Sequence, residues 1–489
     1  MAFSRIDTSS QYLKIAPTRK AKFRPHTPQA INIFLYLPKL FNENMKNQVA
    51  GIVFFLIPFL GFSQAKVKPE NALQSYLTNG DATYSWEIKD SASMGSTKAY
   101  QVLLSSQKWR GIKWTHQLTI IVPSTIQYDG ALLFIDGGSN KDELPNWSKD
   151  SRLWPVLGTI AIKNKAVVTI IRQVPNQPFF DGKTEDELIT YTLNEFRKDK
   201  DYSWPLLFPM VKSAVKGMDA IQEIVAQKTQ HKINNFVISG ASKRGWTTWL
   251  SSAIDDKRVK AIGPMVIDML NMPNSLSYQF ETYGEYSDQI EDYVKIGIPQ
   301  STDSPDGKAI TAMIDPYSYR TKLNVPKMIF VATNDPYWTA DAIKHYFDQI
   351  PGKNLIHYVP NAGHDLGGGK QALEGLSAFF GLTLQNKEYP VSTWNVVKGK
   401  EGFELTVQAK PEELVEAAIW ATTSADRDFR NNLWLTRRVK LEGSTAKYTI
   451  PYVKKGYQAF YMDLKYKDPS GGTYTVSTRI FTTDTTNVL

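Results

Sequence analysis

The stretch VISGASKRGWTTWL (residues 237–250) decides the fold, because an apolar run passes through small residues directly into a Trp-rich helical pattern. A strand that turns sharply into a helix is the setting of a nucleophile elbow, in which a serine is held on a strained turn. Ser242 is the candidate nucleophile. The spacing is G-x-S-x-x-G, because Arg244 stands where the common motif has its second glycine. From these residues alone a plain strand-terminating turn is an equal alternative.

Short apolar strands alternate with amphipathic helices on both sides of this stretch. The strand signals are ALLFIDGG (131–138), KAVVTIIRQVP (165–175), VKAIGPMVID (259–268), PKMIFVATND (326–335) and LIHYVP (355–360). Helical spacing is found over 206–228, 341–350 and 371–384. The alternation predicts an α/β fold: a mostly parallel sheet with helices on both faces, entered through antiparallel strands from about residue 83.

The chain of 489 residues is too long for one compact core, and its composition changes along its length. We expect residues 66–386 to form the α/β domain. Within it, residues 269–315 are rich in Asn, Tyr, Ser, Asp and Gly and interrupt the strand alternation, which is typical of a lid-like insertion. Seven short strand signals follow in residues 387–489 and predict an immunoglobulin-like β-sandwich domain.

The beginning of the chain has the pattern of an export signal over residues 45–65. Met45 and Lys46 precede an apolar run at 49–62, and small residues follow at the cleavage positions. The run is short for a bilayer-spanning helix, so no stable membrane anchor is expected and the mature protein is predicted to be periplasmic or secreted. Residues 1–44 form an upstream extension, interpreted as a start assigned too early or as a disordered basic tail.

Charge and cysteine content exclude several classes of function. Of the net charge of +9, residues 1–65 carry +6 and the remainder only +3, without a long basic block, so a surface that follows nucleic-acid phosphates is not expected. The chain has no cysteine, which excludes a cysteine nucleophile and thiolate zinc. An HEXXH motif and other compact ligand clusters are absent from the sequence, so we expect no metal and no cofactor.

Two later residues complete a hydrolase constellation with Ser242. A serine nucleophile needs a base, and the base needs a carboxylate, which on such a sheet follow in the order Ser, Asp, His. Asp335 ends the strand at 326–335. His364 follows the next strand and alone among the six histidines lies in a glycine-bounded loop at a carboxyl end of the sheet. Asp268 is the alternative acid, because it ends the strand directly after that of Ser242.

An oxyanion hole requires two N–H groups near the nucleophile. The sequence offers the N–H of Lys243 and the Gly137-Gly138 pair after an early strand, although the glycines are equally suited to a plain turn. The charges of Lys243 and Arg244 either hold an anionic group or point into solvent. Aromatic residues expected at the substrate rim, or else in core packing, are Trp246, Tyr283, Tyr337 and Trp338.

The combination of LLFIDGGSN, VISGASKRGWTTWL, FVATNDPYW and NAGHDLGG resembles the PhoPQ-activated pathogenicity-related protein family over about residues 70 to 480. The resemblance implies an α/β-hydrolase fold, with Ser242 as the elbow serine and Asp335 and His364 as its partners. It also implies export, and some relatives act as secreted signals. The G-x-S-x-x-G spacing is similar to that of glucuronoyl esterases, which suggests a carbohydrate ester.

Two hypotheses follow for the function. The first is an exported serine hydrolase that acts on an ester or amide bond of a small-molecule, glycan or peptide substrate. The second is a non-catalytic secreted binding or signalling protein on the same scaffold, with the C-terminal sandwich as the contact surface for a partner. The complete Ser, Asp and His set favours the first. Ester and amide substrates stay open, because leaving-group preference depends on pocket shape.

Overall fold

The computed structural model describes residues 66–147, 153–410 and 414–489, so the predicted signal peptide and upstream extension lie outside the described residues. Residues Ala65–Leu489 belong to one compact unit. None of the helices in the described ranges is long and apolar enough to cross a bilayer.

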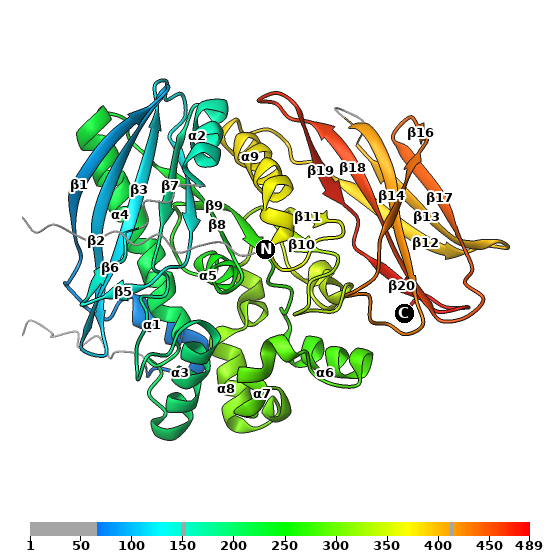
Figure 1. Ribbon diagram of the computed structural model, residues 1–489, viewed down its shortest axis with the longest axis horizontal. Coiled ribbons are helices and arrows are strands. Elements are labelled where there is room, and N and C mark those ends of the chain that lie inside the picture. The colour runs from blue at the N-terminus through cyan, green and yellow to red at the C-terminus, as the bar shows by residue number, and fades with distance from the viewer. Residues whose placement is uncertain (1–65, 148–152, 411–413) are drawn as a thin grey trace, which may run out of the picture. The chain divides into compact units, whose positions relative to one another are not determined.

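The main sheet begins with antiparallel strands and continues with parallel ones (Figure 1). Its first nine strands in chain order are β1 (Ser85–Met94), β2 (Thr97–Trp109), β3 (Ile112–Pro123), β4 (Gly130–Ile135), β7 (Val167–Ile171), β8 (Asn235–Ala241), β9 (Val259–Met265), β10 (Lys327–Ala332) and β11 (Asn354–Val359). Their spatial order is β1-β2-β3-β7-β4-β8-β9-β10-β11. From β7 to β11 the neighbouring strands are parallel. Strands β4, β7 and β10 are buried along their whole length, as expected of a sheet covered on both faces.

Helices cover the two faces of this sheet. On one face, α4 (Leu207–Thr229) and α5 (Lys243–Ser251) share a core with Leu133 and Ile238. On the other, α2 (Leu153–Asn164) and α9 (Lys370–Leu384) pack with Leu132 and Val237. Successive strand residues thus face opposite layers, as alternation along a strand requires. The predicted fold class is confirmed, including the C-terminal sandwich described below.

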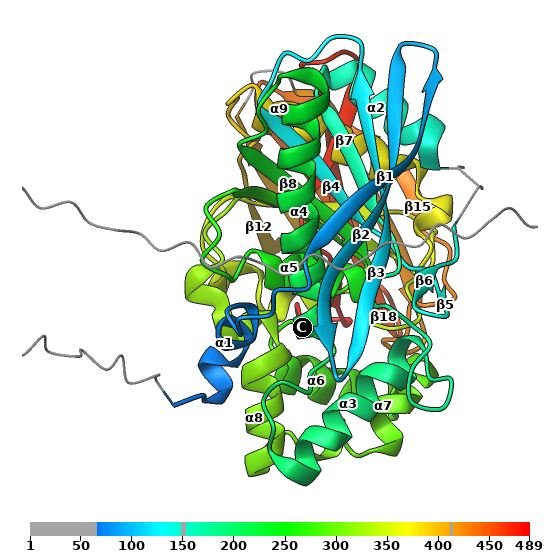
Figure 2. The ribbon, with the colours of Figure 1, turned by 90° about the vertical axis from the view of Figure 1, so that its left-hand side faces the viewer.

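The insertion at 269–315 is largely helical. It contains α6 (Met272–Tyr283), η2 (Asp288–Ile290), α7 (Glu291–Lys295), η3 (Pro299–Ser301) and α8 (Pro305–Ile314). Figures 1 and 2 show α6, α7 and α8 gathered with α3 (Glu185–Asp199) at one end of the sheet. The shorter elements elsewhere are η1 (Pro69–Asn71), α1 (Ala72–Leu77), β5 (Asn140–Lys141), β6 (Leu144–Pro145), η4 (Pro316–Lys322) and η7 (Leu366–Gly368).

The helix expected over 341–350 is wrong. The segment forms two 3-10 turns, η5 (Ala342–His345) and η6 (Phe347–Gln349), which are separated at Tyr346. Tyr346 has φ −145°, outside the helical region, and its fully buried hydroxyl donates a hydrogen bond to Asp268 Oδ1 at 2.6 Å. A tertiary contact therefore overrides the local helical pattern here.

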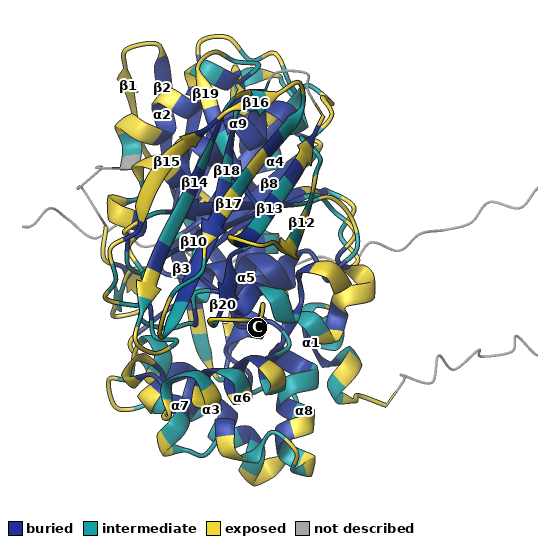
Figure 3. Cartoon of the chain, turned by 90° about the vertical axis from the view of Figure 1, so that its right-hand side faces the viewer, coloured by how far each residue is buried: buried dark blue, intermediate teal, exposed yellow. Residues whose placement is uncertain are grey.

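The C-terminal residues form two antiparallel layers. One consists of β12 (Ser392–Lys398), β13 (Gly402–Ala409), β17 (Thr445–Pro451) and β16 (Leu441–Glu442). The other consists of β14 (Leu414–Ser424), β15 (Leu435–Val439), β18 (Tyr457–Lys467), β19 (Thr473–Ser477) and β20 (Phe481–Thr483). Figure 3 shows β15 coloured as exposed along most of its length.

This sandwich continues the main sheet, because Ile356 of β11 pairs with Ser477 of β19. Two of the seven predicted strands are each divided. Residues 433–442 contain β15 and β16, which belong to different layers, and residues 473–483 contain β19 and β20. The first break lies where the chain passes from one layer to the other, whereas β19 and β20 stay in one layer and both pair with β18.

Candidate functional site

Ser242 occupies the turn between β8 and α5. Its backbone has φ 57° and ψ −125°, a conformation that costs of order 1–3 kcal/mol for a residue other than glycine. Two hydrogen bonds hold the turn: Ser242 N donates to Met265 O at 2.9 Å, and Trp246 N donates to Ser242 O at 2.9 Å. The strain presents the serine at the carboxyl end of β8, as in a nucleophile elbow.

Two glycines allow this turn to approach its neighbours. A Cβ added at Gly245 would lie 2.5 Å from Met265 O, and one added at Gly240 would lie 2.9 Å from Ile135 O. Real side chains do not tolerate such contacts with backbone atoms. The shifted G-x-S-x-x-G spacing is therefore set by packing, since the glycine at 245 faces the strand beside the elbow.

His364 and Asp335 are in direct contact. His364 lies in the loop after β11, and its Nδ1 is 2.8 Å from Oδ2 of Asp335, which follows β10. Asp335 is buried, and its Oδ1 accepts a hydrogen bond from Tyr337 N at 2.9 Å. A neutral imidazole that donates from Nδ1 has an unprotonated Nε2. That Nε2 is buried and has no hydrogen-bond partner.

Ser242 reaches the same edge of the sheet but makes no direct bond to the imidazole. Because β8, β10 and β11 are parallel strands of one sheet, Ser242, Asp335 and His364 all follow strand ends at the same edge, with β9 between β8 and β10. Among the described residues, no hydrogen bond joins Ser242 Oγ to His364 Nε2. Tyr337 lies near both residues. Its ring centroid is 4.1 Å from that of the His364 imidazole, and Tyr337 and Ser242 line the same pocket.

Asp268, the alternative acid, is not paired with His364. It follows β9, is buried, and accepts the hydrogen bond from Tyr346. Burial raises the pKa of Asp268 to about 7, and the nearby negative charge of Asp335 adds to the effect. The structure therefore places Asp335, and not Asp268, against the imidazole.

We expect Asp268→Asn to change how stability depends on pH. The folded-state pKa lies above that of the unfolded chain, so the carboxyl stabilises the fold below about pH 4 and loses this contribution as pH rises to about 7. The asparagine of the variant can still accept from Tyr346 but does not ionise. The free energy of unfolding of the variant, relative to the parent protein, should therefore rise by a few kcal/mol across this window.

Denaturant unfolding at pH 4, 5.5 and 7.5 measures this difference. Asp90→Asn provides a control, because Asp90 is exposed and the same change there should leave the two curves parallel. Parallel curves for Asp268→Asn would contradict the expectation.

The predicted oxyanion-hole groups differ in their availability. Gly137 N already donates to Asp136 Oδ1 at 2.9 Å, so it does not offer a free N–H. Among the described residues, Gly138 N and Lys243 N make no hydrogen bond, and Lys243 stands at the N-terminus of α5, where a helix leaves its N–H groups unpaired. Of the predicted groups, these two N–H groups are the unpaired ones.

The side chains of Lys243 and Arg244 are both held in ion pairs with carboxylates of this chain, in place of the two predicted alternatives, an anionic group or solvent. Lys243 Nζ lies 2.8 Å from Asp186 Oδ2, and both terminal nitrogens of Arg244 lie 2.7 Å from the carboxylate of Glu185. Burial opposes ionisation of Glu185, but the paired Arg244 overcomes it and lowers the pKa of that carboxyl to about 2. These ion pairs tie the first turn of α5 to the start of α3.

Sequence reasoning missed Glu185 and Asp186. The signal was present, because Thr184 precedes three acidic residues and an apolar period, which is typical of a helix N-terminus. Nothing in that pattern shows that the two carboxylates meet the elbow, since the partners lie almost 60 positions apart.

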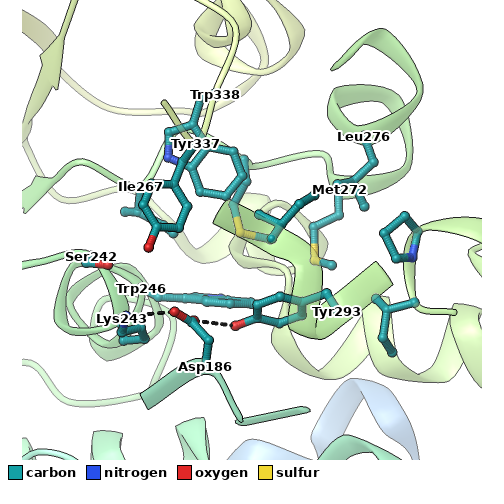
Figure 4. Close-up of a pocket in the computed structure, with 14 residues that line it drawn as sticks. Asp186, Ser242, Lys243, Trp246, Ile267, Met272, Leu276, Tyr293, Tyr337 and Trp338 are labelled. Carbon is teal, nitrogen blue, oxygen red and sulfur yellow. Dashed lines mark hydrogen bonds and ion pairs between the residues drawn. The ribbon is translucent and has the colours of Figure 1, made fainter. Parts of the chain in front are cut away.

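A narrow pocket with a volume of about 40 Å³ adjoins Ser242 (Figure 4). Its walls come from α3, α5 and the insertion, and from the loops after β9 and β10. The lining residues are Asp186, Ser242, Lys243, Trp246, Ile267, Met269, Met272, Leu276, Ile290, Tyr293, Ile298, Pro299, Tyr337 and Trp338. Most of them are apolar, so the surface beside the serine is suited to an apolar group.

Three of the four predicted rim residues line this pocket. Tyr337 and Trp338 are partly buried, whereas Trp246 is a fully enclosed wall residue whose indole donates to Ile314 O. Tyr283 is not among the residues that line this pocket: its hydroxyl donates to Trp338 O at 3.0 Å, and Arg430 stacks on its ring, as in the packing alternative. Tyr283 therefore supports the loop behind the pocket.

Within the described ranges, no group of three or more His, Asp or Glu side chains is placed to hold a metal ion.

Residues 73–430 match the model of a protein family described as PhoPQ-activated pathogenicity-related protein. A similar curated protein is autocrine proliferation repressor protein A from Dictyostelium discoideum, which is 29% identical over 429 residues, covering 81% of this chain and 85% of that protein.

Solved structures that resemble the chain have low sequence identity to it. Acetyl xylan esterase 1 from Thermoanaerobacterium sp. JW/SL YS485 is 15% identical with a TM-score of 0.46, over 65% of this chain and 93% of that one. An S-formylglutathione hydrolase from Agrobacterium tumefaciens is 12% identical with a TM-score of 0.42, over 61% and 99% of the two chains.

Proposed function

The chain belongs to the PhoPQ-activated pathogenicity-related protein family, and on this premise we propose that it is a serine hydrolase that cleaves an ester or amide bond. One observation carries the proposal. Asp335 binds Nδ1 of His364 and leaves Nε2 buried without a partner, at the sheet edge where the strained elbow presents Ser242. A base held in this way is ready to accept a proton from a nucleophile.

The reaction has two halves. Ser242 Oγ attacks the carbonyl carbon while its proton passes to His364 Nε2, and the carbonyl oxygen becomes the oxyanion. The bond to the leaving group then breaks, and His364 returns the proton to the departing alcohol or amine. In the second half, water attacks the acyl-serine, gives a proton to His364, and releases the carboxylic acid as Ser242 regains its hydrogen.

Other groups of the chain stabilise the charges that form during this reaction or position the reacting side chains. Lys243 N and Gly138 N are the proposed oxyanion donors, and removal of one such donor costs on the order of 10²–10³ in kcat. Asp335 fixes the tautomer of His364 and stabilises the imidazolium. Asp186 and Glu185 are positioning residues, because they act through Lys243 and Arg244 on the turn that carries the serine.

Reaction with a fluorophosphonate probe tests the proposal without knowledge of the substrate. The probe should form an adduct on Ser242, located by peptide mass spectrometry, and Ser242→Ala should form none. Ser277→Ala is the matched control, because Ser277 is exposed on α6 and does not line the pocket. A wild-type protein that stays unlabelled would overturn the hydrolase proposal and favour a binding protein on this scaffold.

A further inference from the structure

We propose that the apolar pocket beside Ser242 is the acyl-binding site and that it selects a short, uncharged acyl group. The inference rests on the proposed hydrolase function and specifies its substrate class. Three properties of the pocket carry it: the side of the nucleophile on which it lies, the pairing of its charges, and its volume.

The lining residues place the pocket on the acyl side of the reaction. Ser242 and Lys243 are part of its wall, whereas His364 is not. The acyl group stays bonded to Ser242 Oγ with its oxygen at Lys243 N, but the leaving group must reach His364 Nε2 to receive a proton. A cavity that contacts the nucleophile and the oxyanion donor without the general base therefore receives the acyl chain.

Charge pairing inside the pocket excludes an ionic acyl group. The two charged side chains that line the pocket, Asp186 and Lys243, are bonded to each other (Figure 4), with 2.8 Å between Lys243 Nζ and Asp186 Oδ2. The second oxygen of Asp186 accepts from Tyr293 Oη at 2.9 Å. Each carboxylate oxygen and the ammonium thus already have partners, so a further buried charge would lose its hydration without gaining a new one.

The remaining walls are apolar. Figure 4 shows Ile267 on the side of the pocket near Ser242, and Met272 and Leu276 of α6 at the end away from the serine. The volume of about 40 Å³ is roughly a quarter of that of an engineered cavity of about 150 Å³ that holds benzene. The pocket is therefore suited to an acyl group of a few carbons, such as acetyl, propionyl or butyryl.

A series of p-nitrophenyl esters measures this selectivity in the full-length protein. We expect kcat/KM to be largest between acetate and butyrate and to fall by about tenfold or more at octanoate. The succinate half-ester and the alanine ester, which carry a negative and a positive charge, should be poorer than butyrate by a similar factor.

Two substitutions on α6 move the preference in opposite directions. Leu276→Ala enlarges the pocket and should shift the best substrate to hexanoate or octanoate, and Leu276→Phe should reduce butyrate hydrolysis more than acetate hydrolysis. Phe280→Ala is the matched control, because Phe280 is exposed on the same helix and does not line the pocket; its chain-length profile should equal the parent's. Labelling of Ser242 by a small dialkyl fluorophosphate reports in every variant whether the elbow is intact.

The outcomes separate this inference from the function on which it rests. A parent protein that is labelled at Ser242 but prefers long or charged esters overturns the acyl-pocket assignment and leaves the hydrolase proposal standing. The same holds if Leu276→Ala is labelled normally and keeps the parent's profile. A protein that is not labelled and hydrolyses no ester overturns both.

Discussion

Asp335→Asn is expected to lower kcat by about 10⁴-fold, the loss known when the same change is made in a Ser-His-Asp hydrolase. The physical reason is the tautomer. The amide NH₂ of the new asparagine, placed where Oδ2 now lies, donates to Nδ1 of His364 and forces its proton onto Nε2, so the imidazole can no longer accept a proton from Ser242. Because the amide oxygen of that asparagine still accepts from Tyr337 N, the loop itself should keep its geometry.

The rate of fluorophosphonate labelling measures this loss before any substrate is known. Asp268→Asn is the matched control: it changes another buried aspartate, which follows the neighbouring strand β9 but contacts Tyr346 in place of the imidazole. That variant should keep a labelling rate close to the parent's. Equal losses in the two variants would contradict the assignment of Asp335 as the partner of His364.

Gly245→Ala should destabilise the protein by about 3 kcal/mol or more. The added methyl group would lie 2.5 Å from Met265 O and 3.0 Å from Ile267 Cγ2. Relief requires α5 to move away from β9, which disrupts the hydrogen bond from Ser242 N to Met265 O and the elbow with it. Both the free energy of unfolding and the labelling of Ser242 should therefore decrease.

Gly158→Ala is the control that shows whether the loss of stability in Gly245→Ala comes from the steric clash. Gly158 also lies in a helix, but a Cβ there would have no neighbour closer than 3.9 Å. Without a clash, alanine should be neutral or stabilising by up to about 1 kcal/mol, because it is the better helix former. Thermal and denaturant unfolding of the two variants provide the comparison. If Gly245→Ala is as stable as Gly158→Ala, the close approach of α5 to β9 is not needed for the fold.

The sequence predicted those parts of the fold that depend on local patterns and chain order. Alternating apolar strands and helices indicated the parallel sheet, and small residues around Ser242 indicated a sharp turn. Parallel strands end at one edge, so chain order alone indicated that Asp335 and His364 would lie near each other. Where a local pattern competed with a tertiary contact it failed, as at Tyr346, whose bond to Asp268 replaces the predicted helix.

The sequence by itself determined the sheet, the sharp turn at Ser242 and the residue types proposed for catalysis, because these follow from periodicity and from the order of strands. Only the tertiary structure decided which charges meet. In the folded chain Arg244 pairs with Glu185, and Lys243 pairs with Asp186. His364 bonds to Asp335 and not to Asp268. Hydrogen bonds and ion pairs act over about 3 Å, and a one-dimensional pattern does not specify distances of that size between segments far apart in the chain.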